Sequence, residues 1–159
     1  MNNGILIIAH APLASALREG VLHVFSEYAS QIAAVDVLPQ ASKEASKAAI
    51  RSALTGLGRS HLLLLTDIVG ATPFALAREF SNGTTLQLIA GVNLPMLMRV
   101  MTYRNEALDS LVQRALQGGV NGIEWVAPAP SAADPTAMVA TIPAAIPAAK
   151  LQLKAGAPT

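Results

Sequence analysis

The chain opens with an uninterrupted aliphatic run, residues 4–9, flanked by polar or turn-forming neighbours. Such a run is typical of a β-strand that is buried on both faces of a parallel sheet. After Pro12 the apolar positions recur at the spacing of a helix, at Leu13, Leu17, Val21, Val24, Phe25 and Tyr28. Because proline suits a first helical turn, this part of the sequence predicts a strand followed by a helix.

The same alternation continues along the chain. A strand is predicted near residues 32–37, followed by a helix over about 41–54 whose inward side would carry Ala45, Ala48, Ala49 and Ile50 and which ends at Gly56 to Gly58. A very apolar third strand is expected over 61–66. A short loop, 67–71, then leads to a helix with Thr72 as its N-cap and Pro73 as its first residue.

The remaining elements complete an α/β pattern. They are a strand over 86–90, a helix from the Asn93 cap to about 103, a helix over 107–117 and a last short strand near 123–126. Strands separated by helices predict βαβ crossovers. The expected fold class is therefore α/β, with an open, mainly parallel β-sheet and helices on both of its faces.

One domain is expected over residues 1–127, because a chain of 159 residues is too short for two ordinary domains. Residues 128–159 are dominated by alanine and proline and show no sustained period. We interpret this stretch as a linker-like tail and predict that it is disordered, although its MVATIPAAI segment is apolar enough to dock transiently.

Composition narrows the class of protein. Hydrophobic residues make up 52% of the chain, but no apolar segment approaches the roughly 20 residues that cross a bilayer, so we expect a soluble protein without membrane insertion. The first residues lack the basic start of a secretory signal, which predicts a cytoplasmic location. The absence of cysteine excludes disulfides and thiolate sites. Eleven basic and ten acidic residues, thinly spread, give no footprint for nucleic acid.

Two polar residues stand just past predicted strand ends: His10 and Asp67. In an open α/β sheet, sites form beyond the carboxyl ends of strands, near the point where the strand order reverses. A carboxylate that holds one ring nitrogen of histidine fixes its tautomer and leaves the other nitrogen free as base or nucleophile. The helix starts expected near Pro12 and Thr72 would favour a bound anion, so a phosphate could rest there.

Simpler interpretations remain open for each feature alone. His10 could only bond a nearby carbonyl, Asp67 could only accept amides of the next turn, and Gly70 to Pro73 could only cap a helix. Of the other histidines, His23 falls off the apolar stripe and His61 opens a strand, so neither is a candidate. Nucleotide-binding loops, a nucleophile elbow and a spaced set of metal ligands are all missing, so no metal or other cofactor is expected.

Three blocks of the sequence carry a family resemblance: GILIIAHAPLASAL, LLLLTDIVGATPFALA and IAGVNLPMLMRVMTYR. Together they resemble the IIA component of the mannose-type phosphoenolpyruvate-dependent sugar phosphotransferase system, and the resemblance covers about residues 3 to 126. It implies that His10 accepts a phosphoryl group from the phosphohistidine of the carrier HPr and passes it to a IIB partner. It also implies that Asp67 orients His10, and that the intermediate is a covalent phosphohistidine without a cofactor.

The resemblance further implies a phosphate-binding loop formed by Val69, Gly70, Ala71 and Thr72, with Ala11 beside it. The family often has glycine after the active histidine, whereas this chain has Ala11 and Pro12. Because proline lacks an amide, the loop after the third strand must supply more of the contacts. Members form dimers, in some cases by exchanging an edge strand, so we expect a homodimer. An edge strand of the sheet could accordingly be antiparallel or exchanged between subunits.

Two other functions stay open. The protein could be a regulatory module whose phosphorylation state is its output, without a dedicated sugar permease, because a phosphoryl group adds about −1.5 to −2 charges to a partner surface. It could also be the related phosphotransfer subunit that serves dihydroxyacetone kinase.

Overall fold

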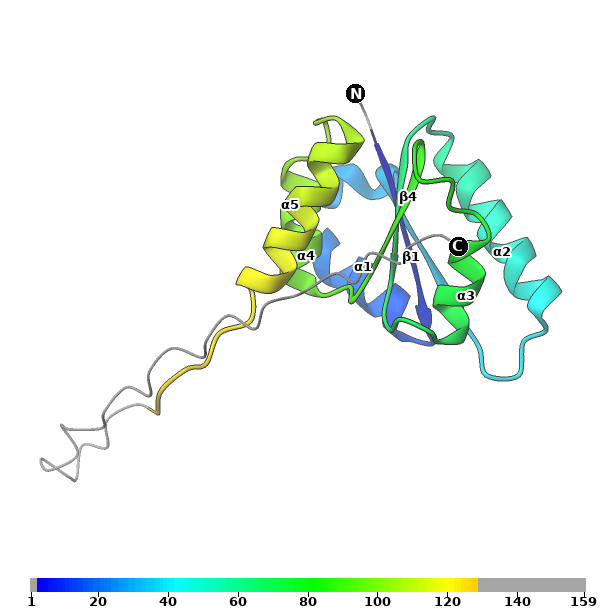
Figure 1. The fold of residues 1–159 in the computed structure, drawn as a ribbon, viewed down its shortest axis with the longest axis horizontal. Coiled ribbons are helices and arrows are strands. Elements are labelled where there is room, and N and C mark those ends of the chain that lie inside the picture. The colour runs from blue at the N-terminus through cyan, green and yellow to red at the C-terminus, as the bar shows by residue number, and fades with distance from the viewer. Residues whose placement is uncertain (1–2, 129–159) are drawn as a thin grey trace, which may run out of the picture. The chain divides into compact units, whose positions relative to one another are not determined.

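The computed structural model describes residues 3–128 of the chain. Strands and helices alternate along most of it (Figure 1). In chain order the elements are β1 (Gly4–His10), α1 (Leu13–Leu22), the 3-10 helix η1 (Ser26–Gln31), β2 (Ile32–Val37), α2 (Lys43–Leu57), β3 (Leu62–Thr66), α3 (Thr72–Arg78), β4 (Leu86–Ala90), α4 (Leu94–Thr102) and α5 (Leu108–Asn121).

The four described strands form one sheet in the order β2-β1-β3-β4, and every pair of neighbours is parallel. The predicted α/β class is confirmed, but the described sheet contains no antiparallel edge strand. The chain runs from β1 out to β2 and returns to β3 on the other side of β1. The strand order therefore reverses at β1 and β3, with Ile8 opposite Thr66 near their carboxyl ends.

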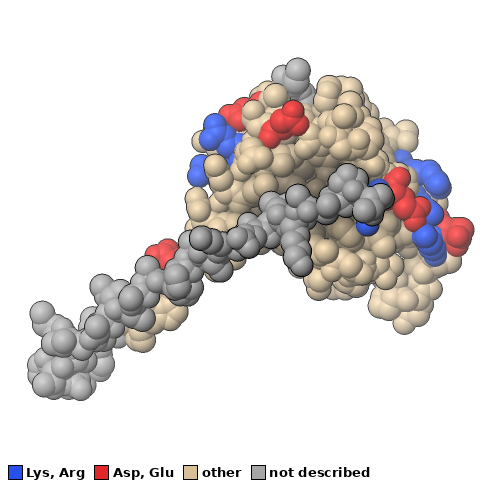
Figure 2. All heavy atoms as spheres, viewed as in Figure 1, with Lys and Arg blue, Asp and Glu red and all other residues tan. Residues whose placement is uncertain are grey.

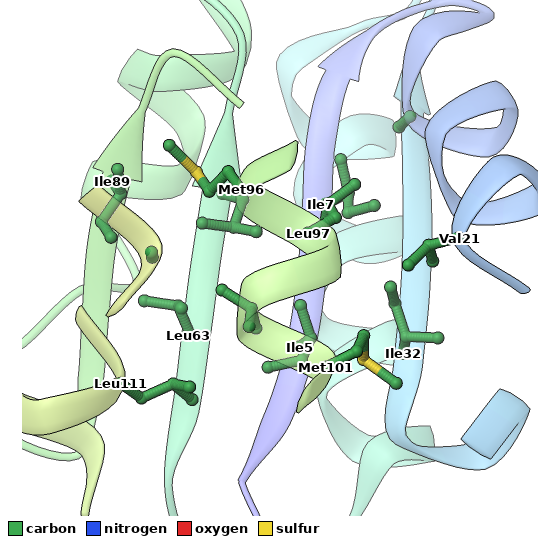
Figure 3. Close-up of a cluster of buried hydrophobic side chains, with 14 of the residues drawn as sticks. Ile5, Ile7, Val21, Ile32, Leu63, Ile89, Met96, Leu97, Met101 and Leu111 are labelled. Carbon is green, nitrogen blue, oxygen red and sulfur yellow. The ribbon is translucent and has the colours of Figure 1, made fainter. Parts of the chain in front are cut away.

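One face of the sheet is covered by α1, α4 and α5. Alternate residues of β1, Ile5 and Ile7, contribute to this side of the core, because successive side chains of a strand point to opposite faces. Figure 3 shows Leu97 and Met101 of α4 packed over them, with Leu111 of α5 nearby. Burial on both faces explains why the central strands β1 and β3 are apolar almost throughout rather than alternating.

The opposite face is covered by α2 and α3, so the sheet lies between two helical layers (Figure 1). Ile50 and Leu57 of α2 and Leu76 of α3 pack there against Leu6 and Ile8. Ile50 is buried as predicted. The expected inward positions Ala45, Ala48 and Ala49 are wrong, since all three are exposed. The small alanine side chains gave little signal to distinguish the two sides of this helix.

Local signals place most helix ends. The Ser42 side chain accepts a hydrogen bond from the amide of Ala45, and Asn93 caps α4 as predicted, accepting from the amide of Met96 at 2.9 Å. The start of α3 differs by one residue from the prediction, because Ala71 is its N-cap and Thr72 is its first helical residue. The Thr72 hydroxyl therefore does not cap this helix, and it lies on the exposed side of the turn.

The predicted strand near residues 123–126 is wrong. Helix α5 continues to Asn121, beyond the predicted end at 117, and residues 123–128 form neither helix nor strand. A strand needs a neighbouring strand to pair its backbone groups, so the large side chains of Ile123, Trp125 and Val126 do not make one by themselves. The tail predicted over 128–159 lies outside the described residues from 129 onward. Each helix within residues 3–128 is too short or too polar to cross a membrane.

Candidate functional site

His10 and Asp67 lie beside one another where the strand order reverses. His10 is the last residue of β1, and Asp67 directly follows β3, the neighbouring strand. The carboxyl ends of parallel neighbours meet at one edge of the sheet, so residues 57 positions apart in sequence come together. This edge is also where α/β sheets usually bind their ligands.

The Asp67 carboxylate binds two atoms of His10, its backbone nitrogen and its ring nitrogen Nδ1. Its Oδ2 accepts a hydrogen bond from the His10 backbone amide at 3.0 Å and lies 2.6 Å from Nδ1 of the imidazole ring. Its Oδ1 accepts from the Ile68 amide at 2.8 Å. The Asp67 side chain is only 7% exposed, whereas that of His10 is 50% exposed. The carboxylate is therefore a buried support for a ring that reaches solvent.

The charge state of Asp67 decides which ring nitrogen of His10 is free. Burial alone would raise the pKa of this carboxyl, but the hydrogen bonds from His10 and Ile68 outweigh burial and hold the pKa below its ordinary value. An ionised carboxylate can only accept hydrogen bonds, so Nδ1 carries the proton that it donates to Oδ2. The neutral ring then has its lone pair on Nε2.

A cleft of about 570 Å³ adjoins the ring. It is lined by His10, Val37, Leu38, Pro39, Ala41, Lys43, Ser46, Gly70, Ala71, Thr72, Ala75 and Leu76. Within residues 3–128, the amides of Val69, Gly70 and Thr72 donate to no acceptor, and the Thr72 hydroxyl has no hydrogen-bond partner. Gly70 adopts a φ of 83°, which favours glycine, so the turn itself depends on this residue.

Ala11 and Ala71, two of the residues predicted to contact the phosphate, already donate their backbone amides to carbonyl groups of the protein. The Ala11 amide donates to the carbonyl of Val37 at 3.1 Å, and the Ala71 amide donates to the carbonyl of Ile68 at 3.3 Å. The sequence suggested that both residues lie beside the phosphate. The structure leaves Val69, Gly70 and Thr72 as the loop residues with uncommitted donors.

The N-terminus of α1 is also occupied, which corrects the prediction that both helix starts are open to an anion. Asp36 of β2 reaches this end of α1, where its Oδ1 accepts from the amides of Ala14 at 3.0 Å and Ser15 at 3.2 Å. The Ser15 hydroxyl donates to Oδ2 at 2.5 Å. The local N-cap residue, Pro12, offers no side-chain cap. A carboxylate from a neighbouring strand thus supplies it.

Replacement of Asp36 by alanine should therefore lower the free energy of unfolding by about 1 kcal/mol, the usual value of a helix cap. Urea unfolding followed by circular dichroism measures this loss. Ser15→Ala, which leaves both amides capped, serves as the matched control and should lose less. An Asp36→Ala protein as stable as the wild type would show that the cap contributes nothing.

The other two histidines have different surroundings. His23 Nδ1 lies 2.8 Å from the carbonyl of Glu19, one turn earlier, and His61 Nδ1 lies 3.1 Å from the Ser60 hydroxyl. Neither lies against a carboxylate. Nowhere in residues 3–128 do three histidine, aspartate or glutamate side chains gather as metal ligands would.

Comparison with protein families gives this arrangement a context. The family model EIIA-man, described as the PTS system fructose IIA component, matches residues 4–116. The chain belongs to this family. The matched range includes all four described strands, His10, Asp67 and the loop that follows Asp67. Members of the EIIA-man family are phosphotransfer components of the phosphotransferase system (PTS), so the expected resemblance is confirmed.

Individual proteins similar to this chain support the family assignment. The PTS system fructose-specific EIIA component of Bacillus subtilis (strain 168) is 30% identical over 111 residues, covering 68% of this chain and 75% of the relative. The PTS system mannose-specific EIIAB component of Escherichia coli (strain K12) is 37% identical over an alignment of 87 positions that covers 48% of this chain. The alignment covers 27% of the EIIAB protein, so the chain spans about a quarter of that protein.

A solved structure supports the fold. The mannose/sorbose specific IIA subunit of the phosphotransferase system from Enterococcus faecalis superimposes with a TM-score of 0.72 at 21% identity. The superposition covers 81% of this chain and 98% of that one. At this identity the likeness establishes the EIIA-man fold and leaves the chemistry to the residues themselves.

Proposed function

We propose that this protein is a phosphoryl carrier that accepts a phosphoryl group on Nε2 of His10 from phospho-HPr and passes it to a IIB protein in the cytoplasm. The observation that carries the proposal is the half-exposed His10 ring held at Nδ1 by the buried Asp67 carboxylate. Membership of a phosphotransfer family agrees with it.

The chemistry follows from the tautomer. The Nε2 lone pair attacks the phosphorus of phospho-HPr, the new N–P bond forms, and the N–P bond to the HPr histidine breaks with its electron pair returning to that ring. The His10 ring gains positive charge as the bond forms, and the Asp67 carboxylate stabilises this charge through Nδ1–H. In the transfer to IIB, a nucleophile of IIB attacks the phosphorus, and the N–P bond to His10 breaks with its electron pair returning to Nε2.

The loop after β3 would hold the transferred group. We propose that the uncommitted amides of Val69, Gly70 and Thr72 and the Thr72 hydroxyl donate to the phosphoryl oxygens, with Ala11 and Ala71 beside them. Backbone amides that face an anion need no reorganisation during the reaction, which is the main advantage of such a loop. The missing amide at Pro12 makes these donors more important.

Incubation with phosphoenolpyruvate, the general phosphotransferase enzyme and HPr tests the carrier role. The intact mass should rise by about 80 Da, the mass of one phosphoryl group, and the added group should be lost in acid. A wild-type protein that gains no mass would contradict the proposal. Mixing the purified phosphoprotein with a IIB protein from the same genome separates a carrier, which loses the group, from a regulatory module, which keeps it.

We also propose that the carrier acts as a homodimer. Leu116 and Val120 of α5 are 43% and 70% exposed, and large apolar side chains on one helix support a subunit interface. Sedimentation equilibrium should give twice the chain mass of 16.4 kDa, and a monomer mass would contradict this part of the proposal.

A further inference from the structure

A group of three charges borders the cleft beside His10. Lys43 Nζ lies 2.8 Å from Oε1 of Glu79, and Lys47 Nζ lies 2.5 Å from Oε2 of the same carboxylate. In Figure 2, basic and acidic side chains lie next to one another over α2. Because two ammonium groups share one carboxylate, the group carries one excess positive charge. Of the three residues, only Lys43 lines the cleft together with His10.

The position of Lys43 is not explained by the stability of the fold. Lys43 is the first residue of α2, where the helix dipole disfavours a positive charge. Its side chain is 59% exposed and that of Glu79 is 41% exposed, and ion pairs so open to water contribute little. The hydrogen bond to Glu79 raises the pKa of Lys43 above an ordinary value that already lies far above neutral pH, so the group is an ammonium ion there.

Lys43 can leave its ion pair with Glu79 for another anion at little cost. An ammonium group on a flexible four-carbon stem can change partners without moving the backbone. If Lys43 leaves, Glu79 keeps Lys47, whose side chain is only 22% exposed, so no carboxylate loses its last cation. A phosphoryl group on His10 would bring about −1.5 to −2 charges into the same cleft and so outcompete the single charge of Glu79.

We propose that Lys43 is a phosphate-binding residue of this site: when His10 is phosphorylated, the Lys43 ammonium leaves Glu79 for the phosphoryl oxygens. This inference rests on the proposed function of His10 and adds a specific cation to it. The loop amides then contact the group from β3, and Lys43 contacts it from α2. Before phosphorylation Lys43 is paired with Glu79, and after Lys43 leaves, Glu79 remains paired with Lys47.

The phosphorus NMR signal of the purified phosphoprotein, followed against pH, tests the proposal without any partner protein. A nearby ammonium group favours the dianionic phosphoryl group, so Lys43→Gln should move the titration midpoint to higher pH by about half a pH unit. Lys43→Arg should restore most of the wild-type midpoint. Glu79→Gln, which frees Lys43, should move the midpoint the other way.

Lys47→Gln is the matched control, because Lys47 lies one turn later on α2, pairs with the same carboxylate and does not line the cleft. It should titrate like the wild type. A Lys43→Gln midpoint equal to that of the wild type would overturn the proposal, and so would equal shifts in Lys43→Gln and Lys47→Gln. A wild-type protein that takes up no phosphoryl group would instead overturn the proposed function itself.

The kinetics of uptake give a second measurement. Lys43→Gln should slow phosphoryl uptake from phospho-HPr about threefold to tenfold at saturating HPr, because one charge-assisted contact to the transferred group is lost. A rise in the apparent KM for phospho-HPr with unchanged kcat would place Lys43 on the docking surface rather than on the phosphoryl group, and would overturn the inference.

Discussion

Replacement of His10 by glutamine should abolish phosphoryl uptake. Glutamine keeps a polar side chain of similar reach but has no ring nitrogen with a nucleophilic lone pair, so no N–P bond can form. The loss should be complete within the detection limit of intact-mass spectrometry after incubation with phosphoenolpyruvate, the general phosphotransferase enzyme and HPr. The fold should persist, because the His10 side chain is half exposed and contributes little to the core.

The two other histidines provide controls for this experiment. His23→Gln and His61→Gln remove the remaining imidazoles of the chain, which has three. Both variants should take up one phosphoryl group at the wild-type rate. If His10→Gln still becomes labelled while one of these variants does not, the acceptor has been assigned to the wrong histidine.

Replacement of Asp67 by asparagine is the second change with a large expected effect. Asparagine preserves shape and one acceptor oxygen, but it removes the charge that keeps the proton on Nδ1 and that stabilises the ring as the N–P bond forms. We expect phosphoryl transfer to slow on the order of 100-fold, the usual scale for one group that positions and stabilises a reacting centre. Rapid-quench measurement of uptake from phospho-HPr gives this rate.

Asp36→Asn is the matched control for Asp67→Asn. Both aspartates end up at the same edge of the sheet and both accept backbone amides, but Asp36 faces the start of α1 whereas Asp67 faces the His10 ring. Asp36→Asn should lower stability and leave the transfer rate near that of the wild type. Equal transfer rates in Asp67→Asn and the wild type would remove Asp67 from the mechanism.

β1 and β3 were predictable from the sequence because both are buried on both faces. Residues 4–9 and 62–65 are aliphatic without interruption, and such runs bounded by polar residues and turns fix the position of a parallel strand within a residue. The Asn93 cap was equally readable, since its side chain acts on an amide only three residues away. Local signals sufficed wherever the stabilising partner is close in sequence.

Features that depend on a residue far away in the sequence could not be predicted. The cap of α1 comes from Asp36 on another strand, so the sequence around Pro12 gave no hint that this helix start was occupied. The alanines of α2 were predicted on the wrong side of the helix, because alanine fits an exposed or a buried side equally well. The run at 123–126 looked like a strand, although strand formation requires a neighbour that the run itself cannot specify.

The residues of the site likewise fall into some that the sequence predicts and some that only the tertiary structure brings together. His10 and Asp67 could be proposed as a pair because each follows a predicted strand, and parallel strands end at a common edge. Lys43 could not be proposed from the sequence, because it opens α2 and its partner Glu79 directly follows α3. Only the tertiary structure pairs the two residues and places Lys43 at the cleft that His10 also lines. The occupied amides of Ala11 and Ala71 likewise emerge only from their carbonyl partners.

NMR of the phosphoprotein prepared with ¹⁵N-labelled histidine shows directly which ring nitrogen carries the phosphoryl group. We expect phosphorus–nitrogen coupling at Nε2 of His10, together with a protonated Nδ1 that still donates to Asp67. Coupling at Nδ1 of His10, or at a ring nitrogen of His23 or His61, would contradict this expectation.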